Sequence, residues 1–171
     1  MCKTLTGKKA QNIIARVEEP FKQLPHLPAS LTNFFVKIAP WGVALGGVFS
    51  ITGAIASLRL SFGMGSISKV INNYLEVSPI YFLLSAVLML VIAFLAFKAF
   101  GPLKERKMEG WIYIFWSNIV SVVHSLLGLI FIYQSGFNLV ISALIGFYLL
   151  FEIKPAYEGK ITQGETKKKK D

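Results

Sequence analysis

Polar side chains in the segment 111–133 are the residues of this chain whose types and spacing suit chemistry. They recur mostly at steps of three and four residues, which places them together along one side of a helix. The residues are Ser117, Asn118, Ser121, His124 and Ser125. His124 lies thirteen residues beyond Trp111, or about 20 Å along such a helix. An imidazole at that depth would suit a proton relay or a contact to a polar substrate, because histidine titrates near neutral pH.

A structural role for His124 is the alternative, and it is the one that we favour. Transporters driven by protons usually carry an Asp or Glu inside the membrane, and the long apolar segments of this chain contain none at depth. Glu152 lies at the border of the last apolar segment, beside Lys154. A neutral histidine that donates one hydrogen bond between two helices needs no acidic partner.

Other chemistries lack the residues that they need. Haem ligation by two histidines, or a metal site, would require a second histidine at depth, whereas His26 precedes the first apolar segment. No acid and no GxSxG setting accompanies a serine and histidine pair, which argues against a serine hydrolase. Cys2 is the only cysteine, which excludes an intrachain disulfide. The sequence therefore predicts no enzyme activity, no cofactor and no metal.

Long apolar segments are the elements that must position these residues. The chain is 54% hydrophobic and only 16% charged, and such an excess of apolar residues needs lipid to face. About 20 apolar residues in a helix cross a bilayer core of about 30 Å. Four segments reach or approach that length: 38–58, 79–100, 111–133 and 136–153. We therefore predict an all-α polytopic membrane protein, an antiparallel four-helix transmembrane bundle with short amphipathic surface helices.

Capping and breaking residues mark the expected ends of these helices. Ser78 suits the N-cap position of the second helix, with a proline behind it at the first helical position. Gly101-Pro102 is expected to stop that helix. Pro40 is expected in the opening turn of the first helix, and Pro155 beyond the end of the last one.

The positions of Lys and Arg predict the orientation. Sixteen of the 18 lie before the first segment, around the loop after the second, or after the fourth, and the others are Arg59 and Lys69. Because regions rich in Lys and Arg stay in the cytoplasm, both termini are predicted to be cytoplasmic, and the location to be the cytoplasmic (inner) membrane. Residues 1–37 then form a cytoplasmic segment, 38–153 the four-span domain, and 154–171 a basic tail expected to be disordered.

The net charge of +9 follows from this segregation and does not indicate a nucleic-acid partner. Basic runs flank apolar spans here, whereas nucleic-acid binding would need them interleaved with aromatic residues on a soluble fold. Aromatic residues at the borders, among them Trp41, Trp111 and Tyr157, suit the headgroup region. The expected partner is the lipid bilayer.

Two shorter segments have the apolar periodicity of helices that lie on a surface. In the second, 67–75, the apolar stripe follows Ser66. In the first, Pro20 is expected to break or kink the helix. Each apolar face either touches lipid or packs against the ends of the bundle, and both alternatives stay open at this point. The face of the first comprises Ala10, Ile13, Ile14, Val17, Phe21 and Leu24.

Small residues recur at every fourth position of the first apolar segment. These residues, which are Gly42, Gly46, Ser50 and Ala54, would let a neighbouring helix approach closely, because packing contacts replace the hydrophobic effect between helices in lipid. Ser142 and Gly146 repeat the spacing in the fourth segment. We favour packing between these two faces within one chain, with a homo-oligomer contact as the alternative.

Two stretches in the second half of the chain resemble a known group of proteins. One is the run FGPLKERK, 100–107, followed by Gly110-Trp111, and the other is ISALIGFYLLFEI, 141–153. Both look like parts of uncharacterised small four-pass membrane proteins of bacteria, which have a short basic loop ending in Gly-Trp and a final span rich in aromatic and aliphatic residues. The resemblance implies a bacterial inner-membrane protein with four spans and supplies no activity.

The function that these features predict is interaction and not catalysis. We expect a scaffold, an assembly factor or an accessory subunit that contacts other copies of itself or another membrane protein through its helices. The alternative is a small oligomeric transporter or pore in which the polar face of the third span lines the path. A transporter needs that face open to water, whereas a scaffold needs it sealed.

Overall fold

The computed structural model of the chain describes residues 8–63, 78–132 and 136–158, and this part contains helices and no strand. Four of its helices contain segments that are long and apolar enough to cross a membrane, as the sequence predicts. A short N-terminal helix and a 3-10 helix precede them. In chain order the elements are α2 (Lys8–Glu18), η1 (Glu19–Gln23), α3 (Ala29–Ser61), α5 (Pro79–Lys104), α6 (Met108–Ile132) and α7 (Gly136–Glu158).

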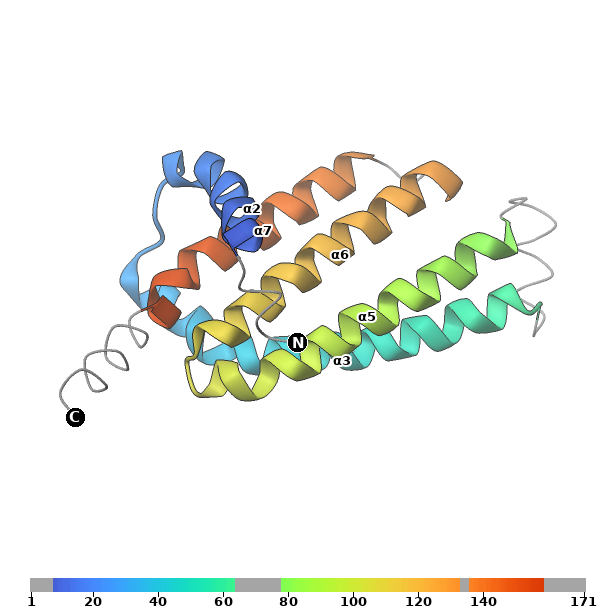
Figure 1. Cartoon of the computed structure of the whole chain (residues 1–171), viewed down its shortest axis with the longest axis horizontal. Helices are drawn as coiled ribbons and strands as arrows, with labels where there is room; N and C mark the ends of the chain where they lie inside the picture. The colour runs from blue at the N-terminus through green and yellow to red at the C-terminus, as the bar shows by residue number, and fades with distance from the viewer. Residues whose placement is uncertain (1–7, 64–77, 133–135, 159–171) are drawn as a thin grey trace.

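Of the four long helices, α5 and α6 form the central pair, with α3 beside α5 and α7 beside α6 (Figure 1). α3 and α5 lie side by side over most of their length, and α6 also packs on α5. α7 packs on α6 and touches α3 only sparsely. The chain passes from α5 to α6 through a short turn at 105–107, and the start of α3 and the end of α7 lie at the same end of the molecule. We call this end the turn end.

α3 begins at Ala29, so the predicted start of this helix at residue 38 was wrong. Pro40 lies well inside the helix and not in its opening turn, and Pro28 takes the N-cap position. The extra turns are stabilised by Val36, which is buried in the core of the turn end. The helix has 33 residues and is therefore about 50 Å long, well beyond the thickness of a bilayer core.

Two further prolines lie inside helices, although the sequence predicts them at or beyond helix ends. α5 continues through Pro102 to Lys104, and α7 continues through Pro155 to Glu158. A proline removes one backbone hydrogen bond, and near a helix end packing can outweigh that loss. The packing here comes from the neighbouring residues Leu103 and Tyr157, which are 1% and 0% exposed.

Both ends of α5 are capped. At its start the prediction is confirmed, because Oγ of Ser78 accepts a hydrogen bond from the N–H of Ile80 at 3.4 Å. At its end Arg106 adopts a φ of 52°, and the N–H of Lys107 donates to the carbonyl of Pro102 at 2.8 Å. This is a Schellman arrangement, in which the position of Arg106 usually carries glycine. It ends α5 and turns the chain into α6.

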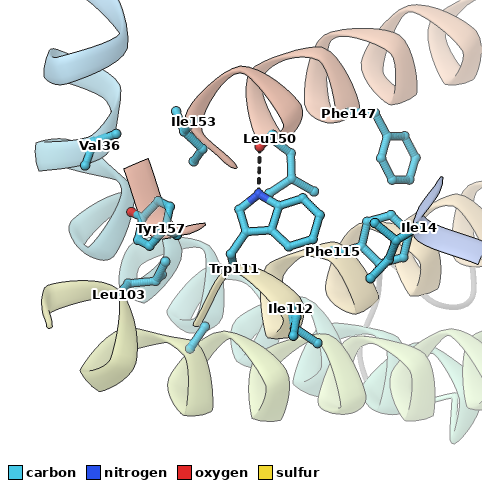
Figure 2. Close-up of a cluster of buried hydrophobic side chains, with 11 residues drawn as sticks. Ile14, Val36, Leu103, Trp111, Ile112, Phe115, Phe147, Leu150, Ile153 and Tyr157 are labelled. Atoms are coloured by element: carbon cyan, nitrogen blue, oxygen red, sulfur yellow. Dashed lines mark hydrogen bonds between the residues drawn. The ribbon is translucent and has the colours of Figure 1, made fainter. Parts of the chain in front are cut away.

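Buried apolar side chains gather at the turn end, in a cluster drawn in Figure 2. Trp111 and Tyr157 are fully buried in it, so their predicted place in a headgroup belt was wrong. At the opposite end, only Tyr81 and Phe82 form a second buried cluster among the described residues. The cluster of the turn end joins five helices and comprises Ile14, Val36, Ala99, Leu103, Trp111, Ile112, Phe115, Phe147, Leu150, Ile153 and Tyr157.

The N-terminal segment packs against the long helices. Ala10 and Ile14 of α2 are buried, and the ring of Phe21 lies 6.3 and 5.5 Å from the rings of Phe147 and Phe151 on α7. Packing on the chain's own helices is therefore the correct interpretation for this part of the predicted amphipathic face.

The remaining predictions for the surface helices have different outcomes. Ile13 and Leu24, which belong to the same predicted face, are each 42% exposed. The predicted break at Pro20 is confirmed, because α2 ends at Glu18 and a 3-10 helix follows. The predicted second surface helix, 67–75, lies outside the described residues.

Gly110 tests the close approach of the start of α6 to the end of α5. A Cβ at Gly110 would lie 2.7 Å from the backbone nitrogen of Leu103, so Gly110→Ala should destabilise the protein by about 1–3 kcal/mol. Gly101→Ala is the matched control, because a Cβ there would meet nothing within 4 Å. Thermal unfolding in detergent should show a lower melting temperature only for Gly110→Ala. Equal melting temperatures would contradict the close approach.

Candidate functional site

His124 of the predicted polar face makes a hydrogen bond to a neighbouring helix. Its Nε2 lies 2.7 Å from Oγ of Ser85 on α5. Ser85 is 3% exposed and His124 is partly buried, so the bond joins α5 and α6 inside the helix pair. The partner of the imidazole is a neutral hydroxyl, which suits a neutral histidine.

The other residues of the predicted polar face, Ser117, Asn118, Ser121 and Ser125, are partly buried. Oγ of Ser121 donates to the carbonyl of Ser117 at 3.0 Å, a bond within α6. Asn118 lies next to α7, because a Cβ at Gly146 would be 3.4 Å from its Oδ1. The polar face is thus divided between the two neighbours of α6, with His124 directed at α5 and Asn118 near α7.

This arrangement can join helices, and it provides little for proton transfer or metal binding. His124 has a hydroxyl and not a carboxylate as its hydrogen-bond partner. Among the described residues, no group of three or more His, Cys, Asp and Glu side chains is placed to hold a metal ion. The chemistry that the geometry supports at His124 is therefore one hydrogen bond between two helices.

The close contact of α3 with α5 passes through Gly47 and not through the predicted face. A Cβ at Gly47 would lie 3.3 Å from Cβ of Ala96 and 3.3 Å from the ring of Phe97. A Cβ at Gly42 or Gly46 would meet nothing within 4 Å. The predicted small-residue face is therefore open at Gly42 and Gly46, whereas Ala54, its last member, is fully buried.

The predicted contact between the two small-residue faces is not formed within the chain at these positions. Ser142 is exposed, and its Oγ donates to the carbonyl of Leu139 in its own helix at 3.1 Å. Ser50 likewise donates to the carbonyl of Gly46 at 2.8 Å. Gly146 packs beside α6, as described above. The homo-oligomer contact stays a prediction.

An open apolar groove of about 210 Å³ lies between α3 and α7, and residues of α6 also line it. Gly42 lies on one wall and Gly146 on the other, and Asn118 of α6 also lines the groove. The two glycines that were predicted to pack together thus face a shared groove. Apolar side chains complete the lining, among them Phe35, Ile38, Leu149 and Ile153.

A polar arrangement that was not predicted from sequence lies at the junction of the N-terminal segment and α7. The side chain of Glu152 is 11% exposed. Its Oε1 accepts a hydrogen bond from the N–H of Leu27 at 2.9 Å, and its Oε2 lies 3.3 Å from Nδ1 of His26. The hydroxyl of Tyr148 donates to the carbonyl of Pro25 at 2.6 Å. These bonds fasten the stretch before α3 to α7.

Lys154 makes a second attachment at the same junction. Its Nζ lies 2.6 Å from a carboxylate oxygen of Glu18 in α2 and 3.3 Å from one of Glu158. It also lies 5.6 Å from the centroid of the Trp111 ring. The adjoining cleft of about 260 Å³ is lined by these paired groups and by Lys22, for which no ion pair is formed among the described residues. The junction therefore suits attachment of the N-terminal segment better than binding of a charged ligand.

Local sequence patterns give no signal for this junction. Leu27 is 125 residues away from Glu152, and Glu18 is 136 residues away from Lys154. Glu152 and Lys154 were predicted only as residues at the border of the last apolar segment, because a local pattern does not reveal contacts over such separations.

Comparison of the chain with protein-family models, with curated proteins and with solved structures finds no match. The resemblance to small four-pass membrane proteins of bacteria therefore stays a prediction.

The hydrogen bond between His124 and Ser85 can be tested by a double-mutant cycle. His124→Leu and Ser85→Ala should each destabilise the protein by about 1 kcal/mol, because each leaves the other group without its partner. The double variant should lose little more than either single variant. Ser121→Ala is the control, since its bond lies within α6. Additive losses in chemical unfolding would show that the two side chains do not stabilise each other.

Glu152 can be tested by limited proteolysis of the N-terminal segment. Glu152→Ala leaves the N–H of Leu27 without its acceptor, which should free this segment and speed tryptic cleavage after Lys22 about tenfold. Glu158→Ala is the control, because that carboxylate is 51% exposed. Equal cleavage rates for the two variants would mean that Glu152 does not hold the segment.

Proposed function

We propose that this chain is an integral protein of a bacterial cytoplasmic membrane, with an antiparallel four-helix bundle and both termini in the cytoplasm. Four helices of sufficient length and apolarity support membrane insertion. The distribution of Lys and Arg supports the orientation, because sixteen of the 18 belong to the regions that this topology assigns to the cytoplasm. The turn end is then the cytoplasmic end.

Within that membrane the protein acts through helix contacts, as a scaffold, an assembly factor or an accessory subunit. The observation that carries this proposal is the outward position of Gly42 and Gly46, where a Cβ would meet nothing within 4 Å. A face of small residues that its own bundle leaves uncovered allows a helix of another copy, or of another membrane protein, to approach closely. Ser50 extends this face without exposing an unpaired hydroxyl, since it bonds to the backbone.

A pore lined by the polar face of α6 is supported less well. Such a path needs polar groups that face one water-filled space. Here His124 bonds to α5, Asn118 lies beside α7, and Ser121 bonds to its own helix. The polar groups are distributed over separate helix contacts, which favours the scaffold over the transporter.

Gly46→Leu should remove partner binding without unfolding the chain. Phe49 lies one turn from Gly46 and is 72% exposed, so a photoreactive benzoylphenylalanine in its place should crosslink to protein in native membranes. Adding Gly46→Leu should abolish the protein adduct while the melting temperature stays unchanged, because the added side chain points away from the bundle. The size of the adduct would distinguish a second copy from another protein.

Two controls sharpen this experiment. Gly47→Leu should lower the melting temperature instead, because its side chain would push against Ala96 and Phe97 at a cost of about 1–3 kcal/mol. Benzoylphenylalanine at Phe94, which is 49% exposed on α5, should crosslink only to lipid. Lipid adducts alone at Phe49 would overturn the proposal.

A further inference from the structure

An aromatic and basic seam lies between α3 and α5 near the turn end. Trp41 of α3 is 60% exposed, and its ring meets that of Phe100 on α5 edge to face, with centroids 5.9 Å apart. Nζ of Lys104 lies 5.6 Å from the centroid of Trp41 and 5.3 Å from that of Phe100. One ammonium group is therefore held over two rings that come from different helices.

A second lysine lies close to this seam. Lys37 is exposed, and it precedes Trp41 by one helical turn, so both lie on the same face of α3. Neither Lys37 nor Lys104 forms an ion pair among the described residues. The seam thus presents two uncompensated positive charges beside exposed aromatic surface.

Two other basic residues at the turn end, Lys107 and Lys154, are paired with acidic side chains. Lys107 is bonded to Glu105, whose hydrogen bond and negative charge raise the pKa of Lys107. Lys154 is held by Glu18 and Glu158.

We propose that the seam formed by Lys37, Trp41, Phe100 and Lys104 binds the phosphate headgroup of an anionic phospholipid. The inference rests on the proposed placement of the chain in a membrane, where the seam lies at the level of the cytoplasmic headgroups. The two ammonium groups match a negative headgroup, and the exposed rings suit the boundary between headgroups and acyl chains.

Apolar surface beside the seam favours a lipid over a free phosphate ion. Leu45, one turn beyond Trp41, is 60% exposed, and Phe97, one turn before Phe100, is 46% exposed. Both lie on the membrane side of the seam, where the acyl chains of a bound lipid would continue.

Lys104 also has a structural explanation that the test must separate. It lies in the last turn of α5, where a cation complements the helix dipole, and its contact with the rings is itself favourable. If that were its whole role, replacing it would change stability and leave lipid binding unchanged. The measurement must therefore report retained lipid and stability separately.

The experiment is native mass spectrometry of the full-length protein after incubation with phosphatidylglycerol or phosphatidylcholine. The wild type should retain phosphatidylglycerol preferentially. Lys37→Gln and Lys104→Gln should each weaken retention about fivefold, the equivalent of about 1 kcal/mol per basic residue near an anionic headgroup. Inorganic phosphate should not displace the lipid, because it lacks the acyl chains.

Lys98→Gln is the matched control, since Lys98 loses the same charge but lies over Phe94, 5.7 Å from its centroid, on another face of α5. It should retain phosphatidylglycerol as the wild type does. The proposed lipid site would be overturned by equal losses of lipid retention for Lys98→Gln and Lys104→Gln, by no preference for phosphatidylglycerol, or by displacement of the lipid by inorganic phosphate. Release of the protein from membranes by carbonate would instead overturn the membrane placement itself, which keeps the two failures distinguishable.

Discussion

Burial of the Trp111 ring between α6 and α7 is the contact on which the turn end depends. Its Nε1 donates to the carbonyl of Leu150 at 2.7 Å, and its ring stacks on Phe115 with centroids 5.7 Å apart (Figure 2). This contact fixes the last turns of α7 against α6. Lys154 can then lie over the indole and reach Glu18 of the N-terminal segment. The attachment of α2 is therefore a consequence of where Trp111 holds α7.

Two kinds of contact stabilise the packing of the helices. At the turn end, aromatic and aliphatic side chains from five helices pack into one core. In the proposed membrane much of the helix surface faces lipid, where burial of apolar surface gives little advantage. Close backbone approach at Gly47 and the bond between His124 and Ser85 are the kinds of contact that act there. The side-chain core thus lies at the turn end, and the contacts of Gly47 and His124 lie farther along the same helices.

Apolar length was enough to predict the four long helices, because it depends on composition along one segment. The helix ends were not predictable in the same way, since they depend on burial by distant segments: Val36 extends α3, Leu103 carries α5 past a proline, and Tyr157 does so for α7. The polarity of the third span was recognised from sequence. The role of Ser85 as the partner of His124 was not, because a single serine in an apolar segment gives no indication of what it contacts. Similarly, the sequence presents small residues on two adjacent faces of the first span, and only the position of α5 selects Gly47.

No contact within the described part of the chain explains why the neighbouring face of α3 carries glycine at positions 42 and 46. A glycine in a helix is less favourable than alanine by about 1 kcal/mol, and at Gly47 the close approach of α5 offsets this loss. Gly46 makes no such contact within the described part of the chain. The polar groups of α6, by contrast, are directed at helices of the same chain. Gly42 and Gly46 on α3 are thus glycines whose cost no contact within the described part of the chain offsets, and this supports the proposal of a functional contact on the surface of the bundle.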